Sequence, residues 1–187
     1  MDPVEKPTLA TPEEVLAFWR EAGPDRWFSK DEAFDLTCRE RFLFTYEAAA
    51  RGDLGEWELT PEGALALILL LDQFPRNMFR GTKAVYRTDP AALMAADRAV
   101  EKGFDRTVEP ALRRFFYLPF MHSEELADQE RSVALNEASG DEDAAAWACH
   151  HHDIIARFGR FPHRNAVLGR AGTAEERAFL AEGNFNE

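Results

Sequence analysis

Residues 60–82 read TPEGALALILLLDQFPRNMFRGT, and this stretch decides the fold. Thr60 followed by Pro61 is typical of a helix start, because Thr caps free N–H groups and Pro fits the first turn. Residues 64–71, ALALILLL, are apolar on every face, so a helix here must be surrounded by other helices. Pro75 is expected to end this central helix, with FPRNMFRG following as an ordered connection.

Similar helix signals recur on both sides of this stretch. Capping residues, first-turn prolines and terminal glycines predict helices over about 11–23, 29–52, 60–75, 88–103, 109–116, 123–140, 141–158 and 173–183. Ser29 with Glu32 is expected to open the second of them. No run of alternating residues is long enough to require a strand. The sequence therefore predicts an all-α protein of about eight helices in antiparallel pairs, in a bundle or a helical array.

One domain is the expected organisation. The chain of 187 residues falls within the size range of one domain, and no Pro/Gly/Ser-rich linker divides it. With 45% hydrophobic residues, 15 Phe and 4 Trp, the composition is typical of a globular protein with an aromatic-rich core. Cys38 and Cys149 lie outside any CxxC spacing and are expected to be reduced core residues. The prediction is a single helical domain over 1–187.

Charge, hydropathy and motifs exclude several classes of function. A net charge of -12 without a run rich in Lys and Arg argues against nucleic acid and an anionic membrane as partners, since either needs a broad positive face. The start, MDPVEKPTLATPEE, lacks the apolar core of a secretory signal, and the longest apolar run falls short of the ~20 residues of a membrane span. Because GxSxG, P-loop, GxGxxG and HExxH patterns are absent, we expect no cofactor and no metal site. The expected location is the cytoplasm.

Arginines gather after the seventh expected helix. The segment IIARFGRFPHRNAVLGRAGT contains four Arg and no acidic residue, namely Arg157, Arg160, Arg164 and Arg170. Arg76 and Arg80 lie in the other FP segment, so two loops are expected to direct guanidinium groups at one anionic group. The alternative is that these Arg residues cap helix ends and pair with Asp72, Asp89 or Glu175.

Histidines form a second constellation. His122 and His163 are expected in loops beside Pro, whereas His151 lies on the apolar stripe of the seventh helix together with Trp147. The first interpretation of His151 is a core residue hydrogen-bonded to a neighbour. The alternative is a group that faces a ligand or transfers a proton.

Acidic residues follow His122 directly. Glu124 and Asp128 are spaced i, i+4 in HSEELADQ, so a carboxylate and imidazole cluster on one helical face is a hypothesis. The alternative is a helix N-terminus in which acidic side chains stabilise the helix dipole.

Three long segments resemble a bacterial family catalogued only as a domain of unknown function, number nine-two-four. They are LLDQFPRNMFRGT (70–82), RRFFYLPFMHSEELADQ (113–129) and HHDIIARFGRFPHRNAVLGR (151–170). The resemblance implies a tetratricopeptide-like array of stacked antiparallel helix pairs, and it implies no activity. The residues of the family pattern, as they stand here, form the candidate ligand-binding set: Asp72, Arg76, Asn77, Arg80, His122, Glu124, Asp128, His151, Arg160, His163 and Arg164.

Three functions are consistent with these residues. The first is a binding module whose Arg- and His-lined pocket takes an anionic small molecule or a peptide carboxylate. The second is an enzyme, a hydrolase or lyase of an anionic metabolite, with His122 or His151 as general acid and base. The third is a scaffold for a protein partner, for which Trp57 is the candidate exposed aromatic residue. The scaffold ranks last, because the polar residues concentrate at three helix junctions.

Overall fold

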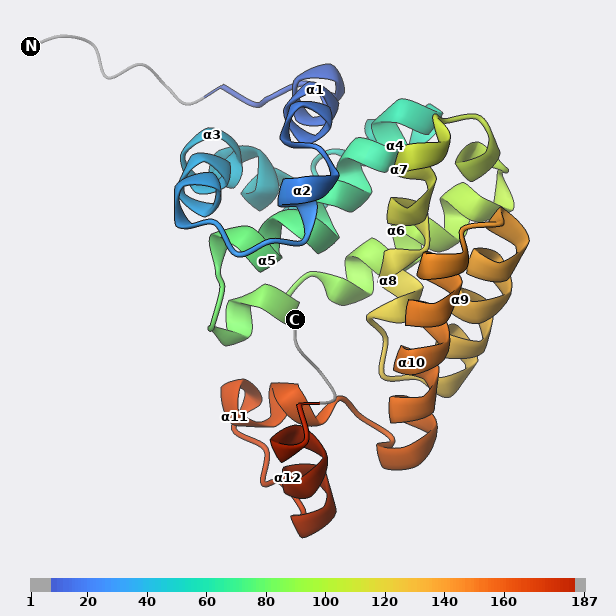
Figure 1. Cartoon of the computed structure of the whole chain (residues 1–187). Coiled ribbons are helices and arrows are strands. Elements are labelled where there is room, and N and C mark those ends of the chain that lie inside the picture. The colour runs from blue at the N-terminus through green and yellow to red at the C-terminus, as the bar shows by residue number, and fades with distance from the viewer. Residues whose placement is uncertain (1–7, 184–187) are drawn as a thin grey trace, which may run out of the picture.

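The computed structural model describes residues 8–183, and every regular element in that range is helical (Figure 1). The α-helices are α1 (Pro12–Ala22), α2 (Pro24–Trp27), α3 (Glu32–Arg51), α4 (Pro61–Ile68), α5 (Phe74–Met78), α6 (Asp89–Glu101), α7 (Pro110–Arg113), α8 (Leu118–Met121), α9 (Leu126–Ser139), α10 (Glu142–Phe158), α11 (Asn165–Leu168) and α12 (Ala174–Ala181). Five short 3-10 segments and one π segment connect them: η1 (Gly55–Leu59), the π segment η2 (Leu69–Gln73), η3 (Lys83–Tyr86), η4 (Phe104–Arg106), η5 (Arg114–Phe116) and η6 (Pro162–Arg164). The predicted all-α class is confirmed.

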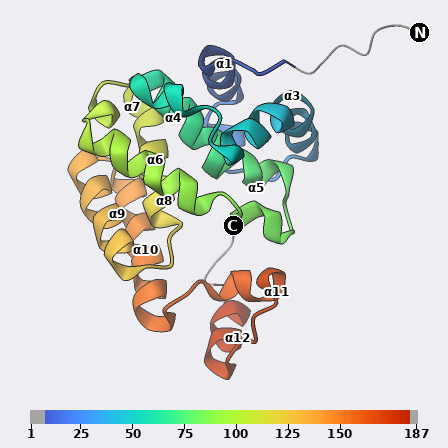
Figure 2. The same ribbon diagram turned by 180° about the vertical axis from the view of Figure 1, so that it is seen from behind.

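Helix α4 lies in the larger apolar core. All its residues from Gly63 to Ile68 are buried, and it packs against α1 and α6 (Figures 1 and 2). Thr60 caps this helix by accepting a hydrogen bond of 3.1 Å from the N–H of Gly63. A Cβ atom at Gly63 would lie 2.3 Å from the carbonyl oxygen of Trp57, so only glycine lets η1 pack this closely.

Pro75 does not end the central helix, and the prediction that it would is wrong. The helix widens into the π turn η2, where the N–H of Phe74 donates to the carbonyl of Leu69, and then continues as α5. Pro75 has no N–H, and the carbonyl of Leu71 four residues earlier accepts a hydrogen bond of 2.6 Å from the Thr88 hydroxyl instead. The π turn thus accommodates the proline without ending the helical path.

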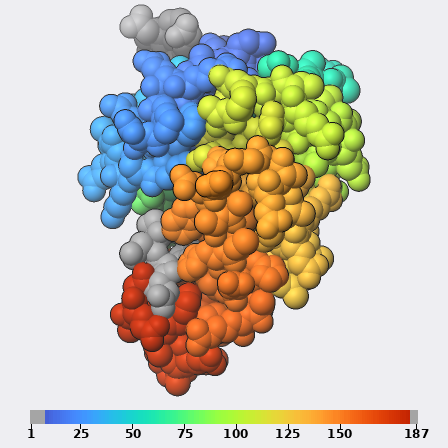
Figure 3. Space-filling model, turned by 45° about the vertical axis from the view of Figure 1, so that its right-hand side comes forward, coloured from blue at the N-terminus to red at the C-terminus, as the bar shows by residue number. Residues whose placement is uncertain are grey.

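A long helical hairpin and a C-terminal segment complete the fold. Helices α9 and α10 pack along each other, and α8 contacts α9 (Figures 1 and 2). A second apolar cluster, separate from the larger core, consists of Ile154, Ile155, Phe161 and Phe179. Figures 1 and 2 place α11 and α12 below α5 and η3, and Figure 3 shows this segment at the lower end of the molecule beside α10. The C-terminal segment, residues 159–183, therefore shares a small core with the end of α10.

Several local expectations need correction. Asp31, not Ser29, caps α3, because its carboxylate accepts from the N–H groups of the next turn at 3.0 and 3.1 Å. Trp147 is 53% exposed although it lies on the predicted apolar stripe, because the small core begins only at Ile154. Cys149 on the same helix is also exposed.

Two further points concern the surface and the architecture. Trp57, the expected exposed aromatic residue, is partly buried against the larger core. Each of the eight expected helices has a counterpart, and the unexpected α2, α8 and α11 have four residues each, too few to show a helical period. A tetratricopeptide-like arrangement stays a prediction. None of the described helices has the length and apolar character that crossing a membrane requires.

Candidate functional site

Three chain junctions meet in space. The first is the π turn η2 with α5, the second is the loop between α8 and α9, and the third follows α10. Nδ1 of His122 in the second junction lies 2.7 Å from Oδ1 of Asp72 in the first. Glu124, also in the second, accepts a hydrogen bond of 2.8 Å from the N–H of Phe161 in the third. The sequence marks each junction by an FP or LP pair but does not show that they converge.

The buried carboxylate of Asp72 is the centre of this arrangement. Its side chain is 0% exposed and accepts hydrogen bonds from Nδ1 of His122 and, at 2.5 Å, from Nε2 of Gln73. Burial alone would raise the pKa of Asp72, but Arg76, His122 and Gln73 together hold this pKa below its usual range. A carboxylate can only accept, so Nδ1 of His122 carries a proton, and in the neutral form of the ring Nε2 is the nitrogen without one.

Two arginines from different junctions meet at one acid. Arg76 lies 3.1 Å from Asp89 and also donates to the backbone carbonyl of Asp72 at 2.7 Å. Arg164 lies 3.8 Å from the same Asp89 carboxylate. Its guanidinium stacks 4.5 Å from the ring centres of both Tyr86 and Phe161, which fixes its plane. We call the set Asp72, Gln73, Arg76, Tyr86, Asp89, His122, Phe161 and Arg164 the junction cluster.

The other two candidate histidines, His151 and His163, border this cluster. His151 is buried, its Nδ1 donates to the carbonyl of Trp147 at 2.8 Å, and its ring lies 5.6 Å from that of Phe161. This geometry fits the interpretation of His151 as a hydrogen-bonded core residue, and a ligand-facing role stays a prediction. The ring of His163 also packs against Phe161, with the two ring centres 5.5 Å apart.

Glu124 joins the second junction to the C-terminal segment. It forms a bidentate pair with Arg170, with distances of 2.7 and 2.9 Å, in addition to its bond with the N–H of Phe161. Burial raises the pKa of Glu124, yet the hydrogen bonds from Arg170 and Phe161 lower it below its usual value overall. This carboxylate is therefore ionised and acts as a clamp between two parts of the fold.

Glu124 and Asp128 do not share a helical face. Helix α9 begins at Leu126, after Glu124, rather than near Ser123. Asp128 accepts a hydrogen bond of 2.6 Å from the Ser123 hydroxyl and so fastens the loop instead of meeting Glu124. The predicted cluster of His122 with Glu124 and Asp128 is therefore not formed, and the carboxylate that His122 contacts is Asp72 from another junction.

The remaining candidate residues lie in separate ion pairs. Arg80 and Asn77 both bind the carboxylate of Asp35, at distances from 2.8 to 3.0 Å. Arg160 forms a bidentate pair with Glu176 at 2.6 and 2.9 Å. Of the four arginines in the candidate set, the structure brings together Arg76 and Arg164. It pairs Arg80 with Asp35 and Arg160 with Glu176, acids that the alternative interpretation did not name.

Four members of the cluster were not candidates on sequence grounds. Gln73 stands next to Asp72 in the DQFP segment, so its position was a usable signal. Asp89 was expected only as a structural partner of arginine, and it does pair with Arg76 and Arg164. Tyr86 carries no signal in the sequence, because its role depends on a contact with a segment that lies far along the chain.

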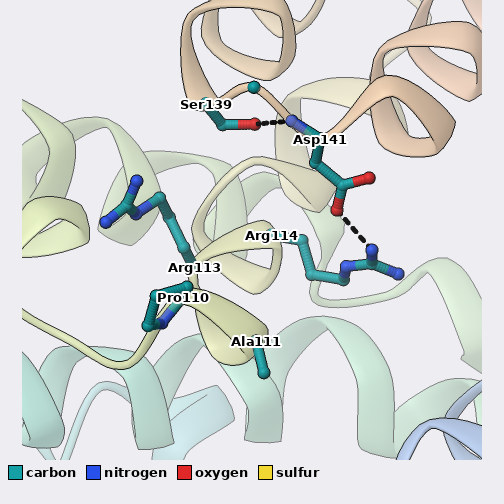
Figure 4. Close-up of a pocket in the computed structure, with 7 residues that line it drawn as sticks. Pro110, Ala111, Arg113, Arg114, Ser139 and Asp141 are labelled. Carbon is teal, nitrogen blue, oxygen red and sulfur yellow. Dashed lines mark hydrogen bonds and ion pairs between the residues drawn. The ribbon is translucent and has the colours of Figure 1, made fainter.

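A hollow of about 350 Å³ opens elsewhere on the surface (Figure 4). It is lined by Pro110, Ala111, Arg113, Arg114, Ser139, Gly140 and Asp141. Arg114 points to the Asp141 carboxylate, with which it forms an ion pair, and Ser139 accepts from the N–H of Asp141 (Figure 4). None of its lining residues belongs to the junction cluster, and its charged pair is satisfied internally.

The described residues do not gather a set of metal ligands. Within residues 8–183, no three His, Cys, Asp or Glu side chains stand close enough together to hold a metal ion.

Fold and site together define an all-α protein with a polar centre where three helix junctions meet. The chain belongs to the family described as bacterial protein of unknown function (DUF924), whose model matches residues 15–184. It is similar to the solved structure of a protein of unknown function, ATU0120, from Agrobacterium tumefaciens. The two are 50% identical with a TM-score of 0.89, over 92% of this chain and 97% of the other. A search of curated proteins gives no match.

Proposed function

We propose that the protein is an enzyme, a hydrolase or lyase, that acts on a small anionic molecule at the junction cluster. The observation that carries the proposal is the hydrogen bond of 2.7 Å between Nδ1 of His122 and the buried carboxylate of Asp72. A carboxylate at Nδ1 fixes the tautomer and orientation of an imidazole, so that Nε2 accepts or returns a proton. His122 is the general acid and base, and Asp72 is its positioning residue.

Arginines supply the affinity for negative charge in this proposal. With His122 neutral, the charges of Arg76, Arg164, Asp72 and Asp89 cancel, and protonation of His122 leaves one net positive charge. An anionic transition state is therefore stabilised most when His122 has taken up a proton. In a chain with a net charge of -12, a cluster whose own charges balance repels an anion less than the acidic parts of the protein do.

A binding module for an anionic small molecule or a peptide carboxylate is the second candidate. It is favoured by one observation, the stacking of the Arg164 guanidinium between Tyr86 and Phe161, which holds a recognition group in place. Such an arrangement serves recognition without requiring a proton acceptor.

A ligand screen followed by turnover measurements separates the two candidates. Thermal shifts of the wild-type protein are measured with a library of phosphorylated metabolites and small carboxylates. A ligand at 100 times its Kd stabilises by about 2.7 kcal/mol. Each ligand that shifts the midpoint is then incubated with wild type, His122→Asn and the matched control His152→Asn, and conversion is followed by NMR.

The outcomes differ for each candidate. An enzyme converts a ligand that it binds, and His122→Asn still binds this ligand but converts it at least about 100-fold more slowly, while His152→Asn remains active. For a binding module, a ligand shifts the melting midpoint, but neither the wild type nor any variant converts it. A library that produces no shift at all contradicts both candidates.

A further inference from the structure

A glutamine of α9 holds the loop that carries His122. Nε2 of Gln129 donates to the backbone carbonyl of Met121 at 2.7 Å and to that of Ser123 at 2.6 Å, the residues on either side of His122. A third, longer contact of 3.4 Å reaches the carbonyl of Phe120. Gln129 is 0% exposed, so these bonds form away from competing water.

We infer that Gln129 is a positioning residue for His122, which acts by fixing the backbone on both sides of the imidazole. This inference rests on the proposed function of His122. The direction of the His122 side chain depends on its backbone, and misplacement of a catalytic group by about 1 Å can cost about 100-fold in rate. Asp72 fixes the orientation of the His122 imidazole at Nδ1, and Gln129 fixes the position of the backbone from which this side chain extends.

Neighbouring polar groups do not share this role. Ser132 and Asn136 lie on the same buried stripe of α9, but they bond to each other within the helix. Asp128 holds the loop through the Ser123 hydroxyl at a less buried position. Among these residues of α9, only Gln129 reaches the peptide groups beside His122.

The exchange rate of the Nδ1 proton of His122 tests the inference. It is measured by NMR on the full chain with ¹⁵N-labelled histidine, without any added ligand. We compare wild type with Gln129→Met, which keeps the volume but removes both donors, and with the matched control Ser132→Ala. We expect exchange of this proton to rise by about tenfold or more in Gln129→Met and to stay within about twofold in Ser132→Ala.

Each result has one meaning. An unchanged exchange rate in a folded Gln129→Met protein overturns the inference, and it says nothing against catalysis by His122. Absence of turnover in the ligand screen contradicts the proposed function but leaves this measurement intact. If Gln129→Met does not fold, hydrogen exchange of the Gln129 side-chain amide in the wild type is measured instead. Exchange as fast as that of an exposed amide overturns the inference, and strong protection supports it.

Discussion

Asp72 combines complete burial with an ionised carboxylate, which is costly unless every partner is present. Three side chains, those of His122, Gln73 and Arg76, offset the loss of water. The Asp72 carboxylate therefore affects both stability and the proposed chemistry, because it orients His122 and also carries a buried charge that its partners must compensate.

The change Asp72→Asn removes this charge with little change in volume. We expect a loss of about 3 kcal/mol in the free energy of unfolding, because a buried ion pair that loses one partner leaves the other uncompensated. For a chain of this size the melting temperature falls by roughly 6 to 12 °C. Urea unfolding measures the loss, with Asp53→Asn in the exposed pair with Arg51 as control. A loss below about 1 kcal/mol would show that the Asp72 charge is not needed.

The π turn is the element that sequence patterns could not foresee. Pro75 was a sound reason to expect a helix end, because proline removes a hydrogen bond and clashes with the preceding turn. The helix continues because the freed carbonyl of Leu71 finds a side-chain donor in Thr88. Such compensation comes from a distant segment, so the local sequence does not reveal it.

Thr88→Val tests this compensation at the level of the element. The hydroxyl of Thr88 is the donor to Leu71, and a buried carbonyl without its donor costs about 1–3 kcal/mol. The matched control is Thr82→Val, whose hydroxyl also bonds to a backbone carbonyl, that of Phe79, but at an exposed position. Chemical unfolding of both variants should show a clear loss for Thr88→Val alone. Equal losses would mean that burial of the π turn carbonyl is unimportant.

Helix α12 should respond to acid. Its capping residue Thr173 bonds to Glu176, whose pKa is lowered to about 2, mainly by the hydrogen bonds from Arg160 and then by those from the backbone of Thr173. Because the folded-state pKa is the lower one, this stabilisation is present above about pH 4.3, the ordinary pKa of Glu, and is lost as pH falls toward 2.

Unfolding of wild type and Glu176→Gln at pH 5 and pH 3 measures this effect. We expect wild type to lose more stability between these pH values than Glu176→Gln does, because the variant has no proton to gain at this site. Glu175→Gln, next in sequence and largely exposed, is the control and should behave like wild type. Equal losses of stability between pH 5 and pH 3 in all three proteins would show that the Arg160–Glu176 pair is not the source of the acid sensitivity.

At the scale of the molecule, the buried apolar side chains of residues 8–183 form two clusters, the larger core and the small core around Phe161. Sequence periodicity was sufficient for the class and for the main helices, since the long helices carry caps and apolar stripes of their own. It also selected most polar residues of the site, because they stand beside prolines at helix ends. The convergence of Asp72 with His122 and the separation of Arg80 and Arg160 depend on tertiary packing, which a single sequence does not encode locally.

Glu124 links the C-terminal segment to the rest of the molecule. In Glu124→Ala both the pair with Arg170 and the acceptor for the N–H of Phe161 are lost. We expect amide hydrogen exchange in α11 and α12 to become about tenfold faster, while α4 keeps its protection. Glu175→Ala, which breaks only the exposed pair with Arg157, is the control. Unchanged exchange in α11 and α12 would show that the small core holds the segment unaided.

The tautomer of His122 tests the central claim most directly, since the proposed chemistry requires Nε2 as proton acceptor. Nitrogen chemical shifts of ¹⁵N-labelled histidine, assigned with His122→Asn, distinguish the two neutral forms of the ring. We predict the Nδ1–H form in the wild-type protein at neutral pH and loss of this preference in Asp72→Leu, which has no acceptor for Nδ1–H. A ring that carries its proton on Nε2, or that shows the same tautomer in a folded Asp72→Leu protein, would contradict the assignment of Asp72 and His122 as the centre of the site.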